Sequence, residues 1–232
     1  MKHISLKNLL AGGMVFAAST VVFAHGDVNP QPVDTAGLPA NGEEWLIENP
    51  YRAETAGEDV WKKAIEIGAS GYNQNCARCH GLEVVSSGLA PDLRFLEAEE
   101  YGDEWYVERF RTGYTQNGVT KMPAFGELLG QDAAWAIRTF IETRPDSDAM
   151  EEVAEELKAL RDQLAGYAND ASAADPDALK TRLNEIASGI ETLSGAPVAD
   201  SVAFRAANLI DGTAPAYKSA AETLTIGLSA AN

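Results

Sequence analysis

The sequence predicts an all-α protein in which one helical domain is followed by a helical hairpin or small bundle. Three observations support this fold class. From Glu58 onward, apolar residues recur at three- and four-residue steps, the spacing of one face of a helix. After Pro145 the composition shifts to Ala, Glu and Leu while the same spacing continues. No run of alternating apolar and polar residues competes as a strand.

The first 24 residues have the features of a secretory signal peptide. Lys2 and Lys7 precede an apolar stretch over residues 9–23. The small or branched residues Val22 and Ala24 fit the signal peptidase pocket, which places cleavage before His25. The alternative is an uncleaved membrane anchor, which needs ~20 mostly apolar residues. Because glycine, serine and threonine interrupt the stretch, we predict that residues 1–24 are a signal peptide. The chain is then expected to be exported to the periplasm.

The charge of the chain is strongly acidic and excludes several classes of partner. The formal net charge is −17, and it becomes −19 without the two signal-peptide lysines, with 16 basic and 35 acidic residues left. Nucleic acid and anionic membrane surfaces are therefore not expected partners. No later segment is apolar enough to predict a membrane span in the mature chain.

Residues 25–145 divide into an arm and a helical domain. Residues 25–57 are rich in Pro, Gly, Asn and Asp and predict an irregular N-terminal arm. Residues 58–145 form the first helical domain, and its elements are a helix from Glu58 toward Cys76, a loop through Pro91, and helices over Asp103–Arg111 and Gln131 to about Thr143.

Residues 146–232 form a separate C-terminal helical region. Two coiled-coil-like seams begin it, and they consist of Met150, Val153, Leu157, Leu160, Leu164 and Tyr167, then Leu179, Leu183, Ile186, Ile190 and Leu193. Asp175-Pro176 is a good start signal for the second helix. Weaker helical patterns at residues 198–210 and 217–228 would complete a small bundle.

The motif that carries chemistry is Cys76-Ala77-Arg78-Cys79-His80. Two thiols at this spacing reach the two vinyl groups of one haem, and the next residue delivers an imidazole to the iron. A thioredoxin-like pair does not need the histidine, and a zinc site would need a second ligand pair that the sequence lacks. We therefore predict one covalently bound haem c, with Cys76, Cys79 and His80 as cofactor-binding residues and His80 as an iron ligand.

The second axial position of the iron decides between electron transfer and ligand binding. Met122 lies in a short Lys-Met-Pro segment between two helices, where periodicity gives no reason for an apolar residue. Met150 belongs to a seam, which explains it without metal, and His25 stands at the new N-terminus. A thioether suits a low-spin ferrous iron, so Met122 is the predicted second metal ligand.

Further residues are candidates for the surroundings of the haem. The carbonyl of Pro91 is a candidate acceptor for the ring N–H of His80, although an ordinary turn proline explains it too. Aromatic residues that could pack on the haem are Trp105, Tyr106, Phe110, Tyr114 and Phe125. Basic residues that could compensate the propionates or meet a partner, or simply be solvated, are Arg78, Arg94, Arg109, Arg111 and Lys121.

With these motifs in hand, residues 58–144 resemble the class I monohaem cytochromes c. The matching positions are Gly68-Ala69-Ser70-Gly71-Tyr72, Asn75-Cys76, Gly81, Ala90-Pro91-Asp92-Leu93 and Met122-Pro123. In that family the first and last helices cross at a small residue and an aromatic, and Gly68 and Trp135 resemble that pair. Residues 49–52, 72–83 and 118–125 more narrowly resemble the PedF-like cytochromes of quinoprotein alcohol dehydrogenase systems.

The resemblance implies an electron carrier without a substrate of its own. Its electron donor would be a quinoprotein alcohol dehydrogenase carrying pyrroloquinoline quinone (PQQ), and its acceptor a downstream cytochrome or terminal oxidase. One alternative is a ligand-binding or peroxidatic haem protein, which requires an open sixth position. Another is a haem-bearing subunit whose C-terminal helices scaffold a partner, because residues 146–232 depart from the family pattern.

Overall fold

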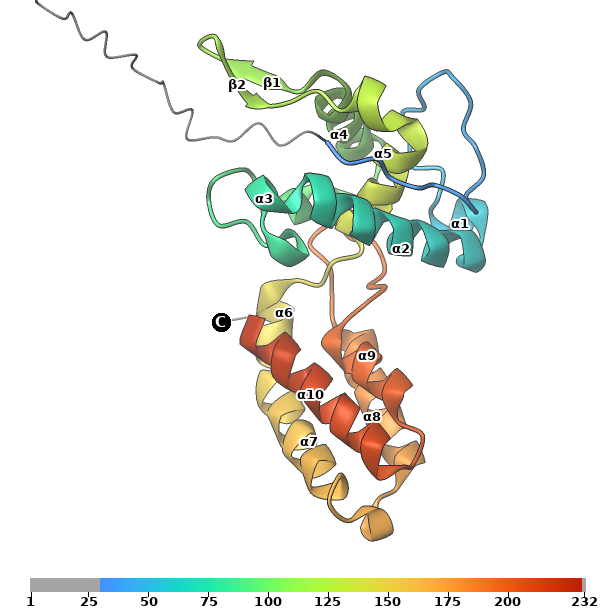
Figure 1. Ribbon diagram of the computed structural model, residues 1–232, viewed down its shortest axis with the longest axis vertical. Helices are drawn as coiled ribbons and strands as arrows, with labels where there is room; N and C mark the ends of the chain where they lie inside the picture. The colour runs from blue at the N-terminus through green and yellow to red at the C-terminus, as the bar shows by residue number, and fades with distance from the viewer. Residues whose placement is uncertain (1–29, 231–232) are drawn as a thin grey trace, which may run out of the picture.

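In the computed structural model, which describes residues 30–230, two crossing helices organise the first half of the chain (Figure 1). They are α2 (Glu58–Asn75) and α5 (Gly126–Glu142), and both are drawn in the upper part of the figure. The predicted signal peptide and His25 lie outside the described residues. None of the described helices is both long and apolar enough to cross a bilayer.

The crossing of α2 and α5 depends on a glycine. A Cβ at Gly68 would overlap the carbonyl oxygen of Ala136 and lie 2.9 Å from the Cβ of Phe140. Only glycine therefore allows this approach of the two backbones. Phe140 of α5 lies against Gly68, and the ring of Trp135, the aromatic expected at this crossing, packs against Tyr106 with ring centroids 6.4 Å apart.

The helix predicted from Gln131 is the regular part of α5. Gly130 has φ +75° and separates a first turn at Gly126 from the continuous helix that follows. The predicted helix over 103–111 is confirmed as α4 (Glu100–Thr112). Shorter helical pieces are α1 (Ala53–Ala56), α3 (Ala77–His80), η1 (Leu82–Val84) and η2 (Leu93–Phe95).

In the described part of the chain, one short hairpin stands among the helices. Strands β1 (Tyr114–Gln116) and β2 (Val119–Met122) pair antiparallel between α4 and α5, where a loop was expected. Asn117 and Gly118 form the turn with φ of +51° and +76°. Two positive φ angles are the requirement of the tight hairpin turns that favour Asn-Gly.

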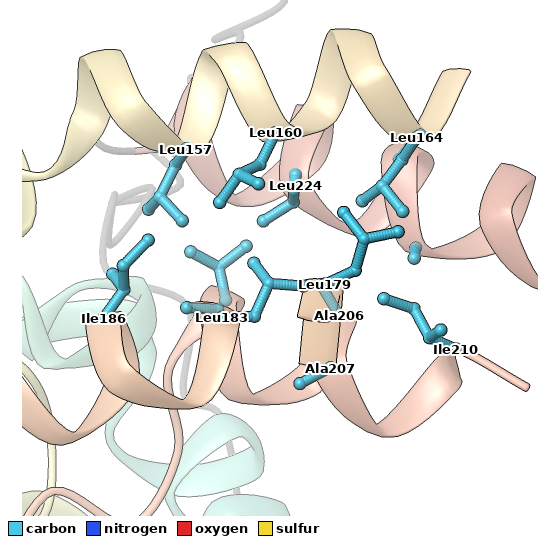
Figure 2. Packing of buried hydrophobic residues seen from close by; sticks show 14 of the residues in the cluster. Leu157, Leu160, Leu164, Leu179, Leu183, Ile186, Ala206, Ala207, Ile210 and Leu224 are labelled. Carbon is cyan, nitrogen blue, oxygen red and sulfur yellow. The ribbon is translucent and has the colours of Figure 1, made fainter. Parts of the chain in front are cut away.

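The C-terminal region forms a small helical bundle, drawn below the first domain in Figure 1. Its helices are α6 (Ser147–Glu152), α7 (Ala154–Tyr167), α8 (Pro176–Gly189), α9 (Val202–Leu209) and α10 (Ala214–Ala230), with η3 (Ala171–Ala173) between α7 and α8. Helix α10 packs against α7 and α9, and α9 packs against α8. The leucines of α7 and α8 face one another across the shared core (Figure 2).

Local signals set the ends of these helices. The Asp175 side chain accepts a hydrogen bond from the Ala178 amide at the start of α8, as predicted. The Ser201 side chain does the same for Phe204 in α9. The first predicted seam is divided between α6 and α7 at Val153, and Ile190 and Leu193 of the second seam lie beyond the end of α8.

Candidate functional site

The Cys76 to His80 motif forms one helical turn at the end of α2. Cys76 closes α2 by donating its amide to the Tyr72 carbonyl at 2.8 Å. The amides of Cys79 and His80 then both donate to the Cys76 carbonyl, at 3.1 and 3.0 Å. The two thiols are free and thus available for bonds to another group.

The thiol chemistry argues against a redox pair. Burial, and to a smaller extent the neighbouring Cys79, raises the pKa of the Cys76 thiol to about 12. Reactive Cys-X-X-Cys pairs instead have a thiol whose pKa is lowered below its ordinary value. Within the described residues no group of three or more His, Cys, Asp or Glu side chains is placed to hold a metal ion.

The imidazole of His80 is oriented by a backbone carbonyl. Its Nδ1 lies 2.9 Å from the carbonyl oxygen of Pro91, which confirms the predicted role of that carbonyl. Because a carbonyl can only accept, Nδ1 carries the proton and Nε2 keeps a free lone pair. Burial lowers the pKa of His80 despite this hydrogen bond, which keeps the ring neutral and suited to metal binding.

An aromatic cluster stands beside this turn. Tyr106 and Phe110 of α4 pack with Phe125 and Trp135, and all four side chains are buried. Of the aromatics expected here, Trp105 and Tyr114 do not join the cluster, and both rings contact the guanidinium of Arg109 near the surface instead. The indole N–H of Trp135 is buried without a hydrogen-bond partner, so this core contains an unused donor.

Met122 packs, half-buried, against the same cluster as Tyr106 and Cys76. It ends β2 opposite Tyr114, and its carbonyl lies against Gly113, where a Cβ would overlap it. Met150 lies in the separate core of the C-terminal bundle. Of these two methionines, Met122 is therefore the one that belongs to the core of the Cys76–His80 turn.

These residues fit a covalently attached haem. Two thiols one turn apart, an imidazole with a free Nε2, a thioether and an aromatic wall are the donor set and surroundings that such a group needs. The sulfur of Cys79 is at the exposed side of the turn. The edge of a macrocycle bound there would therefore reach the protein surface.

The expected roles of the nearby basic residues are not uniform. Arg78, Arg111 and Lys121 are exposed and Arg109 is half-buried, so they are accessible to a partner or to solvent. Arg94 is buried, only 6% exposed, and its guanidinium is occupied by protein groups. It is thus not a surface cation.

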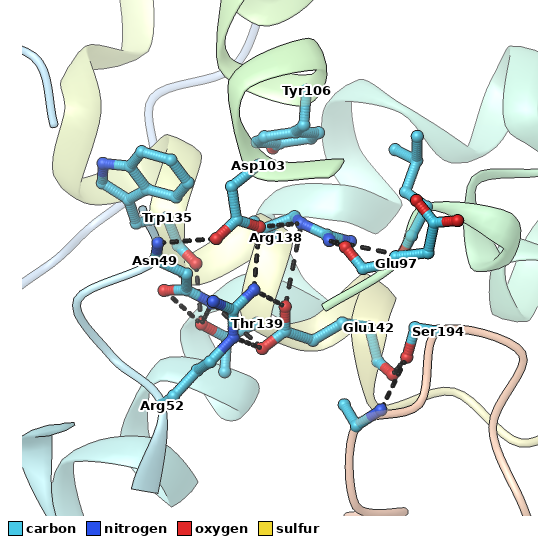
Figure 3. A network of polar contacts seen from close by, with 12 residues as sticks. Asn49, Arg52, Glu97, Asp103, Tyr106, Trp135, Arg138, Thr139, Glu142 and Ser194 are labelled. Carbon is cyan, nitrogen blue, oxygen red and sulfur yellow. Dashed lines mark hydrogen bonds and ion pairs between the residues drawn. The ribbon is translucent and has the colours of Figure 1, made fainter. Parts of the chain in front are cut away.

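A buried network of charged residues joins the N-terminal arm, α4 and α5, and it was not predicted from the sequence (Figure 3). Asp103 accepts hydrogen bonds from Arg138 Nε and Arg52 Nη2, both at 2.8 Å. Glu142 accepts from Arg52 at 2.8 Å and from Asn49 Nδ2 at 3.1 Å. The Asn49 to Arg52 stretch, noted only by resemblance, therefore attaches the N-terminal arm to α4 and α5.

Comparison with known proteins gives consistent results. The family described as cytochrome C oxidase, cbb3-type, subunit III matches residues 63–141. Cytochrome c550 of Pseudomonas aeruginosa is 50% identical over 139 residues, which are 59% of this chain and 94% of that protein. The quinohemoprotein alcohol dehydrogenase ADH-IIG of Pseudomonas putida is 31% identical over 78 residues, 34% of this chain but 10% of that enzyme. No solved structure matches.

Proposed function

The chain belongs to the cytochrome c family and carries covalently bound haem c, and from this premise we propose which residues hold the haem. Cys76 and Cys79 form the two thioether bonds, and His80 and Met122 are the axial iron ligands. The observation that carries this assignment is the 2.9 Å contact between His80 Nδ1 and the Pro91 carbonyl, which leaves Nε2 for the iron. Within this scheme residues 58–145 are the cytochrome domain and residues 146–232 an additional helical region.

The chain's function is electron transfer, and we propose that it acts as a carrier and not as an enzyme. The haem iron supplies a single-electron couple between Fe(II) and Fe(III). With His80 and Met122 both bound to it, the iron would have no open position for oxygen or peroxide. Exposed apolar residues beside the thioether turn, Leu82 and Val85, form a surface where electrons enter or leave.

The proposed location is the periplasm and the proposed donor is a PQQ-dependent alcohol dehydrogenase. Residues 1–24 read as a signal peptide, which supports export. One relative is itself named a quinohemoprotein alcohol dehydrogenase, so a segment like this one occurs within such an enzyme. A separate cytochrome can serve the same electron path, passing electrons on to a downstream cytochrome or terminal oxidase.

Ligation by Met122 is tested with a matched pair of substitutions. We expect Met122→Leu to keep covalent haem but to lose the low-spin, six-coordinate state, because the leucine fills the space and cannot bind iron. Met150→Leu makes the same change in the bundle core and should leave the visible and near-infrared spectra unchanged. A Met122→Leu protein with the wild-type spectrum would exclude this ligand.

The partner is tested by stopped-flow reduction of the oxidised protein by a quinoprotein alcohol dehydrogenase and its alcohol. Residues 25–145 contain 20 acidic and 10 basic side chains, so docking to a basic or mixed patch should slow as ionic strength rises past ~0.1 M. Unrelated periplasmic donors serve as the control. Reduction no faster than by those donors would reject the partner, and the peroxidatic alternative would appear as peroxide turnover by the wild-type protein.

A further inference from the structure

Two loops of the cytochrome domain that flank His80 are attached to the segments that join this domain to the C-terminal region. One is the turn Gly81–Val84 that follows the histidine, and the other is Pro91–Arg94, which carries its carbonyl partner. The attachment site, called the junction below, consists of residues 143–147 and 191–200. There the chain leaves α5 for α6 and returns between α8 and α9 (Figure 1).

Arg94 connects the Pro91 loop to the junction. Its Nε and Nη2 donate to the two carboxylate oxygens of Asp92, at 3.0 and 2.8 Å. Its Nη1 donates across to the Pro145 carbonyl at 3.1 Å and to Ser147 Oγ at 2.8 Å. Since Asp92 directly follows Pro91, the contacts form an unbroken path from Ser147 at the start of α6 to the His80 ring.

The Asp92 carboxylate is held in its charged form by this arrangement. Burial works against its ionisation, but the hydrogen bonds and charge of Arg94 outweigh burial and lower the pKa of Asp92 below its ordinary value. The side chains are 7% and 17% exposed, so water screens the pair only weakly. The planar fork of an arginine binds both oxygens of the Asp92 carboxylate and still donates to Pro145 and Ser147, whereas the single ammonium nitrogen of a lysine cannot reproduce that two-pronged geometry.

Arg144 makes the second connection, to the turn after His80. Its Nη1 donates to Glu83 at 2.7 Å and its Nη2 to the Asp200 carbonyl at 3.3 Å, while the guanidinium lies 4.5 Å from the ring centre of Phe140. Glu83 and Val84 have φ of +54° and +67°, a conformation unfavourable for a β-branched residue. Such backbone persists only where surrounding contacts hold it.

The junction itself is a built interface and not a flexible linker. The Asp146 amide donates to the Glu191 carbonyl at 2.8 Å, and Pro145 pairs with Thr192 as a β-bridge. Ser194 binds two segments of the cytochrome domain, at Ala98 and at Glu142. Its carbonyl accepts from the Ala98 amide at 2.9 Å, and its hydroxyl donates to the Glu142 carbonyl at 2.5 Å.

We propose that Arg94 and Arg144 are positioning residues through which the C-terminal helical region sets the orientation of His80 and thereby the reduction potential of the haem. This inference rests on the proposed ligation of the iron by His80. The hydrogen bond from Nδ1 to a fixed carbonyl raises the basicity of a ligating imidazole. A more basic imidazole stabilises Fe(III), so loosening the Pro91 carbonyl raises the potential.

The sharpest variant is Ser147→Ala in the full-length holoprotein. It removes one oxygen from the C-terminal side of the Arg94 contacts and changes neither the Arg94–Asp92 pair nor any proposed haem ligand. We expect a higher reduction potential and displaced hyperfine-shifted NMR signals of the His80 ring. Ser188→Ala is the matched control, because that hydroxyl binds only a carbonyl within α8 and is exposed.

A second pair of variants tests the guanidinium. Arg94→Lys should shift the potential in the same direction, whereas Arg182→Lys, which alters an exposed pairing with Glu156 and Glu185, should not. Ser147→Ala added to Arg94→Lys should cause little further shift, because both changes interrupt one path.

Equal potentials and NMR signals for Ser147→Ala, Ser188→Ala and the wild type would overturn the proposal, as would full additivity of the two junction substitutions. Failure of the haem assignment itself would look different. The wild-type protein would then lack the spectrum of a His/Met-ligated low-spin haem before any substitution is made.

Discussion

At the scale of single residues, the cytochrome domain buries charged side chains that its sequence alone would place at the surface. Arg138, Asp103 and Glu142 are at most 1% exposed, although charged residues are rarely buried this completely. Each is paired, yet one nitrogen of Arg138, Nη1, has no hydrogen-bond partner. Ion pairs of this kind give little net stability, but removing one partner is costly because the remaining charge stays buried.

Asp103→Asn should therefore destabilise the holoprotein strongly. The change leaves Arg138 and Arg52 to share the remaining carboxylate of Glu142, and we expect the free energy of unfolding in urea to fall by about 3–5 kcal/mol. Glu156→Gln, which removes an exposed partner of Arg182, is the control and should produce no measurable change. A loss for Asp103→Asn as small as that of the control would show that water reaches the network.

The same contrast explains which site residues the sequence could reveal. Cys76, Cys79 and His80 could be predicted from the sequence, because their chemistry depends on local spacing within one helical turn. The Pro91 contact follows from the known need of a ligating imidazole for an acceptor. The burial and the partners of Arg138 and Arg94 could not be predicted, because a single arginine in a helix or loop is usually solvated. Only the folded structure places partners around it.

At the scale of secondary structure, the close contact of α2 with α5 is the most exacting feature. We expect Gly68→Ala to lower the free energy of unfolding by about 1–3 kcal/mol or more, because the new methyl overlaps the backbone of Ala136 and not a movable side-chain end. Gly166→Ala in α7 is the matched control. That position has open space around it, so the substitution should stabilise by about 0.5–1 kcal/mol.

Thermal unfolding of both glycine variants, followed by far-ultraviolet circular dichroism, measures the difference. If Gly68→Ala were as stable as Gly166→Ala, the two helices would be able to separate without cost. The crossing would then not be the element that fixes the cytochrome core.

Helices were predictable from the sequence where apolar periodicity is long, and the exceptions have physical causes. The hairpin at 114–122 is missed because all but one of its strand residues are exposed and give no alternation. Asn117-Gly118 was the available signal for it. The break at Val153 is invisible to periodicity, because apolar residues on both sides of it still face one core.

At the scale of the whole molecule, residues 30–230 contain two separate hydrophobic cores. The first surrounds Tyr72, Tyr106 and Phe110 in the cytochrome domain. The second lies within the bundle, where the leucines of α7, α8 and α10 are buried (Figure 2). The two cores share no residue, and the two parts of the chain meet through the polar junction. We therefore expect the bundle to fold on its own apolar core, without the haem.

Removing the haem tests this division. In the full-length chain, Cys76→Ala combined with Cys79→Ala abolishes thioether attachment, and the core that packs around the haem should lose its order. We expect backbone amides of α2, α4 and α5 to exchange rapidly in hydrogen–deuterium exchange mass spectrometry. Amides of α7, α8 and α10 should remain protected, since their buried leucines belong to the bundle core, which shares no residue with the cytochrome core.

The junction amides make the outcome more specific. The Ala98 amide should lose protection, because the Ser194 carbonyl no longer meets an ordered loop, whereas the Asp146 amide keeps its acceptor at Glu191 within the bundle. The wild-type holoprotein supplies the reference protection at both sites. If α7 and α8 exchanged as fast as α2 and α5, the chain would unfold as one unit. The bundle would then depend on the haem for its own folding. Its influence on the haem through Arg94 and Arg144 would be only one direction of a mutual dependence.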